Sequence, residues 1–176
     1  GSPNVWDSPH PHSHTRCALR RRYDLRTELR RLWRISETIR PIAICVIRRG
    51  GEILVFESFD RVKGETFYRP LGGGIEFDEL GKDAVAREIQ EEIDAELKDV
   101  SYVGAIENLF SFERRRGHEI VLVYEATFAD PTLCDRITFD GVEDNGEPID
   151  VKWMSLEYFR QGSAPLYPDN LLELIS

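Results

Sequence analysis

The stretch GGGIEFDELGKDAVAREIQEEIDA, residues 72–95, places three adjacent glycines before a segment rich in acidic side chains. Apolar residues recur through its second half with the period of an α-helix, which predicts a helix between residues 81 and 95. The apolar stripe consists of Ala84, Val85, Ile89 and Ile93. The polar side of this helix carries a concentration of negative charge that needs an explanation.

Glu88, Glu91 and Glu92 are three and four residues apart, so a helix brings them to one face with Cβ atoms roughly 5–6 Å apart. An acidic run is often only a solvated face, but like charges at this spacing repel one another. Mg²⁺ prefers oxygen ligands and is commonly held by a few carboxylates together with substrate phosphates. The helix is therefore predicted to be a metal platform, with Arg87 pairing with Glu91 at position i+4.

The glycines are predicted to determine the course of the backbone and not to bind phosphate. A phosphate-binding P-loop would contain Gly-Lys followed by Ser or Thr, and this stretch has no such sequence. Glycine permits a tight turn and a close approach of the backbone to a ligand. Gly73 is therefore expected either to direct its carbonyl at a metal or to allow the turn into the helix.

The spacing across the whole stretch resembles the Nudix box, G-x5-E-x7-R-E-U-x-E-E-x-G-U, in which U is aliphatic. Gly73, Glu79 and the run REIQEE beginning at Arg87 fall at the required positions, and eight of nine specified positions match when Ala95 counts as aliphatic. The departure is Asp94, where the family has glycine. This position falls at the helix end, where left-handed backbone is common and Asp tolerates it better than most residues, so a local stability cost is expected.

Nudix hydrolases typically cleave nucleoside diphosphates linked to another moiety, using Mg²⁺ or Mn²⁺ and water. The metal ligands that the resemblance implies are Glu88, Glu91, Glu92 and the Gly73 carbonyl. The resemblance further implies that Arg87 and Glu79 orient this cluster through a salt bridge and hydrogen bonds. These six residues, with one further acid, form the predicted catalytic site.

The general base has several candidates. In some family members it is a glutamate of the box, which would be Glu88 here, and in others it is an acid outside the box. Glu119, at the start of a predicted strand, is the first outside candidate, and Glu143 and Glu147 in a long loop follow. A structural role at the rim of the site is the alternative for Glu119.

Nucleotide contacts are expected from residues near the box. Arg69 and Arg114 could contact phosphates, with solvent-exposed charge as the alternative. The arginine run continues through Arg115 and Arg116. Phe67, Tyr68 and Phe110 could stack on a base, although core packing is the alternative for aromatic residues in strands. Phe112, which is aromatic but lacks the hydroxyl of the tyrosine found near this position in dinucleoside polyphosphate hydrolases, is a further predicted binding residue. The substrate itself stays unassigned.

The remaining pattern predicts a mixed sheet. Strands are expected at residues 41–47, 52–58, 66–69, 97–110, 118–128 and 150–154, with a hairpin around Gly50-Gly51. Residues 129–148 read as a loop, and short helices are expected after residue 155 and over residues 170–175, the last capped by Asp169. Helices on both faces of the sheet define an α/β fold, a Nudix-type α/β/α sandwich with a loop-helix-loop catalytic motif.

Charge divides the chain into three predicted regions. Residues 1–15 are expected to be a disordered or cloning-derived tail, and residues 16–40, with nine arginines and three acids, a basic amphipathic helix. Residues 41–176 form the predicted Nudix domain, with 14 basic and 28 acidic residues. Because phosphate binding needs positive potential, such a body argues against broad nucleic-acid binding and requires metal ions or local arginines for a phosphate ligand.

These patterns predict a metal-dependent pyrophosphohydrolase acting on a small nucleoside diphosphate derivative, with Mg²⁺ as cofactor and Mn²⁺ as substitute. The alternatives are a nucleotide sensor without turnover and an enzyme of RNA ends that uses the basic helix. Three widely spaced cysteines favour a cytoplasmic location, and no apolar run suits a membrane. The sequence leaves open whether two copies form a homodimer, and the amphipathic helix could form the interface.

Overall fold

The computed structural model describes residues 38–142, 146 and 148–176, which belong to a compact unit spanning residues 36–176. The predicted tail and nearly all of the predicted basic helix lie outside the described residues. Glu143 and Glu147, two candidate bases, lie outside them as well. The division of the chain into three regions therefore stays a prediction.

The described chain begins with the hairpin of β1 (Ile39–Arg49) and β2 (Glu52–Asp60), followed by β3 (Glu65–Arg69) and β4 (Gly72–Gly74). Helix α2 (Gly81–Ile93) precedes the long hairpin of β5 (Leu97–Phe112) and β6 (Arg115–Phe128). A 3-10 turn η1 (Pro131–Asp135), β7 (Thr138–Val142), β8 (Pro148–Ser155), α3 (Leu156–Arg160) and α4 (Leu171–Leu174) complete it.

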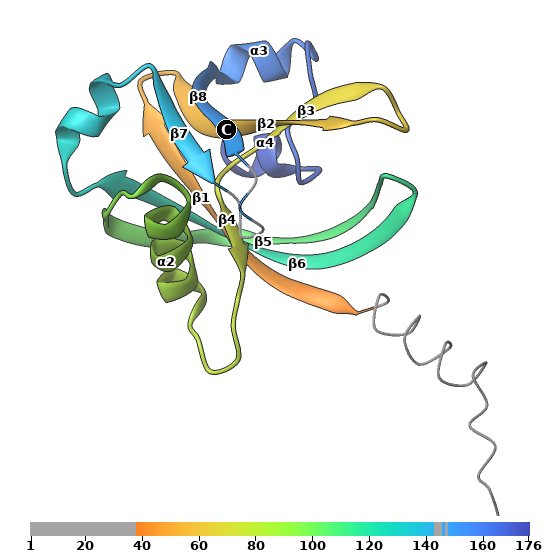
Figure 1. Cartoon of the computed structure of the whole chain (residues 1–176), viewed down its shortest axis with the longest axis horizontal. Coiled ribbons are helices and arrows are strands. Elements are labelled where there is room, and N and C mark those ends of the chain that lie inside the picture. The colour runs from red at the N-terminus through yellow and green to blue at the C-terminus, as the bar shows by residue number, and fades with distance from the viewer. Residues whose placement is uncertain (1–37, 143–145, 147) are drawn as a thin grey trace, which may run out of the picture. The chain divides into compact units, whose positions relative to one another are not determined.

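The strands form a mixed sheet in the order β5-β6-β1-β2-β8-β7, with β3 paired to β2 and β4 paired to β1 (Figure 1). β1 and β6 run parallel, with Arg40 opposite Glu119, and the other pairs are antiparallel. Parallel pairing of β1 with β6 requires a long crossover, which carries α2. This crossover brings α2 and β4 beside β1.

Two apolar cores cover the two faces of the sheet. Ala43 and Cys45 of β1 pack with the buried side of α2, whereas Ile42 and Ile44 pack with residues of α3 and α4. Adjacent residues of a strand point to opposite faces, so the continuous apolar run of β1 supplies both cores. Helices therefore lie on both sides of a mixed sheet, and the predicted α/β/α sandwich is confirmed.

The structure differs from the predicted elements in four places. β4 forms from the triple glycine, and η1 and β7 form within the predicted loop. Ile39 and Arg40 belong to β1 and not to the predicted N-terminal helix, because they pair with β6. The last helix is capped by Asn170 in left-handed conformation and not by Asp169. Short strands of glycine or mixed polarity lack a periodic signal, so only tertiary pairing reveals them.

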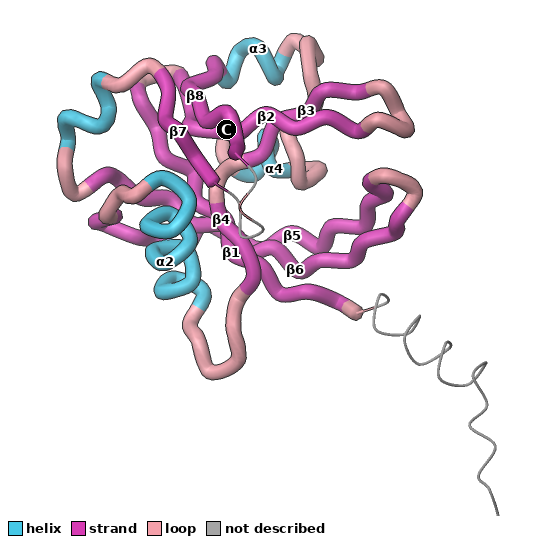
Figure 2. The backbone as a smooth tube through the Cα atoms, viewed as in Figure 1, coloured by secondary structure: helices cyan, strands magenta, loops and turns pink. Residues whose placement is uncertain are grey.

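Two hairpins extend on the same side of the molecule (Figure 2). One consists of β2 and β3, and the other of β5 and β6. Their tips meet, because the backbone N–H of Arg61 donates to Glu113 Oε1 at 3.1 Å and the N–H of Glu113 donates to Asp60 Oδ2 at 3.4 Å. We call this reciprocal contact the tip clasp. It closes the far end of a cleft between the hairpins.

Candidate functional site

The face of α2 toward β4 carries acidic side chains among apolar ones. Glu88 and Glu92 are only 3% and 7% exposed and lie beside Ile89 in the same helix, whereas Glu91 is exposed. Burial of a carboxylate is costly unless it is hydrogen-bonded or paired. Glu92 Oε2 accepts a hydrogen bond from the backbone N–H of Gly72 at 3.1 Å, which joins the helix to β4.

Arg87 connects the acids of the box. Its guanidinium forms a bidentate pair with Glu79, through Nε at 2.8 Å and Nη2 at 3.0 Å. Its Nη1 donates to Glu88 Oε1 at 2.8 Å and to Glu91 Oε2 at 3.1 Å, and Nη2 also donates to the carbonyl of Gly74 at 2.9 Å. One cation therefore orients three carboxylates and the end of β4. The contacts expected for Arg87 and Glu79 are present.

The ion pair between Arg87 and Glu79 shifts the pKa of both side chains. The hydrogen bonds that Arg87 donates to Glu79 raise the pKa of Arg87 above its ordinary value despite partial burial, and the one to Glu88 adds to the effect. In return, Arg87 and then the backbone N–H of Glu76 hold the pKa of the Glu79 carboxyl below its ordinary value. Arg87 and Glu79 are therefore both charged near neutral pH.

Two of the three glycines are required by close contacts. Gly72 has φ +132°, and a Cβ there would lie 2.2 Å from the carbonyl oxygen of Ala43. A Cβ on Gly73 would lie 2.5 Å from the Glu88 carboxyl group, whereas a Cβ on Gly74 would meet open space. The glycine run thus lets β4 pair closely with β1 and lets the Glu88 carboxylate rest against the backbone.

Asp94 ends α2 in the left-handed region, at φ 51° and ψ 50°. Its N–H donates to the carbonyl of Gln90 at 3.1 Å, and its side chain accepts from the Gln90 amide. This is the conformation expected from the missing glycine of the box. Asp94 therefore preserves the geometry of the helix end.

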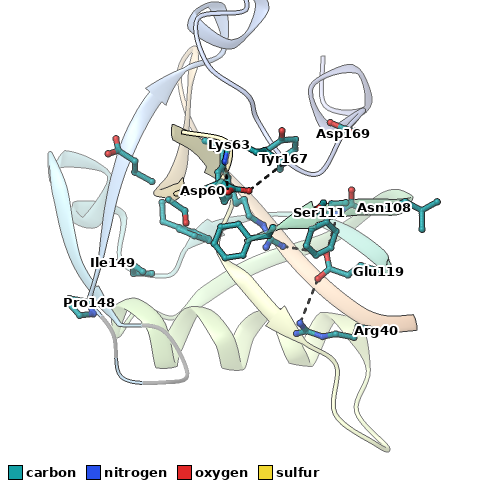
Figure 3. A pocket seen from close by; sticks show the side chains of 18 residues that line it. Arg40, Asp60, Lys63, Asn108, Ser111, Glu119, Pro148, Ile149, Tyr167 and Asp169 are labelled. Carbon is teal, nitrogen blue, oxygen red and sulfur yellow. Dashed lines mark hydrogen bonds and ion pairs between the residues drawn. The ribbon is translucent and has the colours of Figure 1, made fainter. Parts of the chain in front are cut away.

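A cleft of about 710 Å³ opens between the two hairpins, and Figure 3 shows the side chains around it. One wall comes from β2 and β3, where the pairs Phe56–Arg69 and Ser58–Phe67 share a face. The opposite wall comes from β5, β6 and β1. A cleft of this size fits a nucleotide-sized ligand.

Glu119 lies in the wall of this cleft, 3% exposed, and is held by three polar neighbours (Figure 3). Its carboxylate lies 3.9 Å from the guanidinium groups of both Arg40 and Arg69, and accepts from Asn108 Nδ2 at 3.3 Å. The two arginines come from β1 and β3, so the acid connects the two walls. The structure places the predicted residues Arg69 and Glu119 together.

The same residue stands apart from the acids of α2. Glu119 shares its face of β6 with Val121 and Val123, which pack in the core beneath α3 and α4, whereas α2 packs against the other face. β6 is also two strands away from β4, a separation of roughly 10 Å. Glu119 therefore lies near the box but outside its cluster of carboxylates.

Aromatic rings line the outer part of the cleft. Phe112 meets Phe67 edge to face at 5.9 Å between ring centroids, and Phe67 meets Tyr167 at 5.3 Å. Such rings offer flat surfaces on which a nucleobase could stack. Of the predicted nucleotide contacts, Phe112 and Arg69 line the cleft, and Arg114 lies beyond it at the exposed hairpin tip.

The cleft and the α2 acids are close neighbours across β1 and β4. The N–H of Ile75 donates to the carbonyl of Pro41 at 3.1 Å. Pro41 follows Arg40 of the cleft, and Ile75 follows Gly74, which accepts from Arg87. This backbone bond connects the segment beside Arg40 to the segment beside Gly74, and no residue of α2 is among the described residues that line the cleft.

The donor set of α2 consists of hard oxygen atoms, which suits Mg²⁺ or Mn²⁺. Among residues 38–142, 146 and 148–176, no three acidic, histidine or cysteine side chains converge as a ready-made metal site. The contacts of Arg87 explain this, because its Nη1 is bonded to oxygen atoms of both Glu88 and Glu91. The residues fit a hard divalent ion in chemistry, because Arg87 donates to one oxygen of each of these two carboxylates and a carboxylate has two.

Sequence patterns did not single out several residues of the cleft. Arg40, Asn108 and Tyr167 line it, together with Lys63 of the β2–β3 turn. Only the strand register could have found Asn108 and Arg40, since both lie opposite Glu119. Tyr167 comes from a segment without regular structure, and no sequence signal marks it.

The fold and the acidic helix define a class of protein, and comparison with known families agrees. The family model described as NUDIX domain matches residues 38–173, so this chain belongs to the NUDIX domain family.

Among individual proteins, the chain is similar to two enzymes that carry the same name. The chain is 30% identical over 111 residues to the NAD-capped RNA hydrolase NudC of Pseudomonas syringae pv. tomato, a match covering 63% of this chain and 36% of the relative. It is 31% identical over 118 residues to the enzyme of that name from Pseudomonas putida, covering 67% of this chain and 37% of the relative. The chain thus spans little more than a third of the length of these relatives.

Solved structures support the fold. A NUDIX hydrolase from Nitrosomonas europaea superimposes with a TM-score of 0.55 at 14% identity, covering 78% of this chain and 86% of that one. A MutT NUDIX hydrolase from Burkholderia pseudomallei gives 0.51 at 22% identity, covering 69% and 86%. Among the described residues, no helix is both long and apolar enough to cross a membrane.

Proposed function

We propose that this protein hydrolyses a pyrophosphate bond in a nucleoside diphosphate derivative by attack of water on phosphorus. The observation that carries this proposal is the position of the α2 acids beside a cleft whose wall holds Arg40 and Arg69. A nucleotide needs a surface for its base, positive charge for its phosphates and a site for the reaction. The cleft supplies the first two, and α2 supplies the third.

The α2 acids would hold divalent metal. Glu88, Glu91 and Glu92 are the proposed ligands, with the Gly73 carbonyl as a further one, and a bound ion would polarise the diphosphate and lower the pKa of a bound water. Arg87, itself paired with Glu79, orients the carboxylates of Glu88 and Glu91. Because Glu88 is buried against Gly73 and paired with Arg87, it is positioned to serve as a base from within the box.

The cleft would hold the nucleoside part of the substrate. Phe67 and Phe112 would contact the base, and Arg40 and Arg69 the sugar-phosphate. Glu119 keeps the two arginines in place, since it is the acid between them. We assign Glu119 a positioning role, and its role as general base stays an untested alternative.

The names of the relatives support a proposal for the substrate class. NudC is named for hydrolysis of NAD-capped RNA, so a dinucleotide joined through a diphosphate, free or at the end of RNA, is the favoured substrate. The finer proposals are Mg²⁺ as the ion, with Mn²⁺ as substitute, a cytoplasmic location and pairing of two copies. They rest on the donor set, the cysteine pattern and the expected amphipathic helix.

The test is a substrate screen with and without Mg²⁺. The panel contains NAD, other dinucleotides, nucleoside diphosphate sugars and nucleoside triphosphates, and the products are separated by chromatography. Release of nucleoside monophosphates that depends on the metal is the expected result. Tight nucleotide binding without turnover across the panel, by protein shown to be folded and metal-bound, would indicate a sensor and refute the proposal.

A further inference from the structure

Positive charge gathers at the tips of the two hairpins. Residues 41–176 contain 14 basic residues against 28 acidic ones, yet five of the 14 lie in residues 61–63 and 114–116. They are Arg61, Lys63, Arg114, Arg115 and Arg116. We call these five residues the basic tips. In a body with this excess of acid, the basic tips are a local exception.

The tip clasp brings the two groups together. The bonds of Arg61 to Glu113 and of Glu113 to Asp60 connect the β2–β3 turn to the β5–β6 turn. Asp60 also accepts from the backbone N–H groups of Val62 and Lys63 at 2.9 and 3.0 Å. Asp60 and Glu113 are thus hydrogen-bonded to backbone, and the five cations lie on or next to the two turns that the tip clasp joins, with Lys63 lining the cleft.

The cations are accessible to a ligand. All five residues of the basic tips are exposed. Lys63 lies 3.8 Å from Asp60, and within the described part of the chain none of the four arginines takes part in an ion pair. A polyanion would supply the counter-charge that these four arginines lack among the described residues.

The backbone at one tip is strained. Glu113 and Arg114 have φ values of +51° and +65°, and Phe112 pairs with Arg115, so they form a two-residue turn. Such turns favour Asn-Gly, because both positions need positive φ. Glu and Arg there cost stability, and strain of this kind is concentrated at functional positions. The cost is offset in part by the tip clasp, to which Glu113 contributes.

We propose that the basic tips bind the phosphate backbone of single-stranded RNA whose 5′ nucleotide occupies the cleft. Lys63 and Phe112 line the cleft and belong to the two tips, so a chain leaving the cleft passes directly over them. Phe112 offers a ring for stacking beside the cations, the combination typical of single-strand binding. The surrounding acidic body would repel an anionic membrane, which favours a narrow strand over a broad surface.

The inference rests on the proposed function only for the reaction at the 5′ end, and the binding can be measured separately. The full chain and two variants of equal charge change are compared, Arg115→Gln with Arg116→Gln, and Lys98→Gln with Arg160→Gln. All four positions are exposed, and only the first two lie at the tips. The probe is a short single-stranded RNA with a 5′ NAD cap, and fluorescence anisotropy is recorded in EDTA at several salt concentrations.

The tip variant is expected to bind the RNA about tenfold more weakly at low salt, and its salt slope should fall by about 1.4, since each lost contact removes about 0.7. The Lys98 and Arg160 variant should stay close to the wild type. Hydrolysis of free NAD should be equal in all three proteins. Equal RNA affinity in both variants would overturn the inference, even with NAD turnover intact.

Two further results separate the alternatives. If no protein hydrolyses NAD but the tip variant alone loses RNA binding, the proposed function fails and the binding surface stands. Vesicles containing phosphatidylserine are the control for a lipid ligand. Their binding to the wild type with the same dependence on Arg115 and Arg116 would overturn the assignment to RNA.

Discussion

Charge is arranged in opposite ways on the acidic helix and around Glu119 in the wall of the cleft. On α2, one cation, Arg87, contacts three carboxylates. In the cleft, one carboxylate, Glu119, lies between two guanidinium groups. In each of these two places a single ion lies among two or three ions of the opposite sign and holds them in position. The acids of α2 call for a metal ion, and the two guanidinium groups beside Glu119 offer a local positive site for a phosphate, within a cleft whose lining holds four carboxylates and three basic side chains.

The largest effect is expected on the acidic side. Glu91→Gln should lower turnover by more than about 100-fold, because even residues that only support metal ligands commonly cost 10–100-fold. Glu91 is exposed, so the fold should persist. Steady-state kinetics with NAD at several Mg²⁺ concentrations measures the loss. Glu96→Gln, an exposed acid just after the helix, is the matched control, and an equal loss there would deny Glu91 a special role.

Removing Arg87 should increase the electrostatic repulsion among the acids around it. Arg87→Ala leaves the nearly buried Glu88 without this partner, so the free energy of unfolding should fall by about 1–3 kcal/mol. Urea denaturation measures this change. If the acids form a metal site, Mg²⁺ should restore more stability to this variant than to the wild type. The same Mg²⁺ response in both proteins would count against a site shared between Arg87 and the ion.

The central acid of the cleft should behave differently. Glu119→Gln is expected to raise KM, because Arg40 and Arg69 lose their anchor, while kcat changes by less than about tenfold. Loss of a general base would instead lower kcat by about 10²–10⁴-fold. The pH profile of kcat/KM distinguishes the two, since a positioning residue leaves its acidic limb unchanged. Glu107→Gln, an exposed acid on the neighbouring strand, is the control.

The smallest effect is expected at the end of α2. Asp94→Gly should raise the free energy of unfolding by up to about 1 kcal/mol, since glycine adopts the left-handed conformation without strain. The gain is limited by the lost hydrogen bond to Gln90 and by the greater freedom of glycine in the unfolded chain. Thermal unfolding measures the change. Destabilisation would mean that the side-chain contact outweighs the backbone strain.

The acidic side could be predicted from sequence because its determinants are local. The helical period, the offsets of Glu88, Glu91 and Glu92 and the left-handed Asp94 all follow from spacing within one segment. The structure places α2 at Gly81–Ile93, close to the predicted limits. The contact of Arg87 with Glu91 lies within one helical turn and follows from the same spacing, whereas the contact with Glu79 was implied by the family resemblance.

The cleft could not be predicted in the same way because its residues are distant in sequence. Arg40, Arg69 and Glu119 meet only through the register of β1, β3 and β6. Strand alternation indicated that Glu119 and Val121 share a face, but not which face lies against α2. β4 was missed for a related reason, since glycine has no strand propensity and pairs only because β1 is beside it.

The adjacent glycines at 72 and 73 carry one further consequence, for the pattern of tolerated mutations. Alanine at Gly72 would collide with the backbone of Ala43, so it should be lost through misfolding. Alanine at Gly73 would collide only with the Glu88 carboxyl group, so it should leave a folded but impaired protein. A mutational scan scored by activity alone would show two equally intolerant neighbours beside a permissive Gly74. Scoring abundance as well would separate them, one constrained by architecture and the other by chemistry.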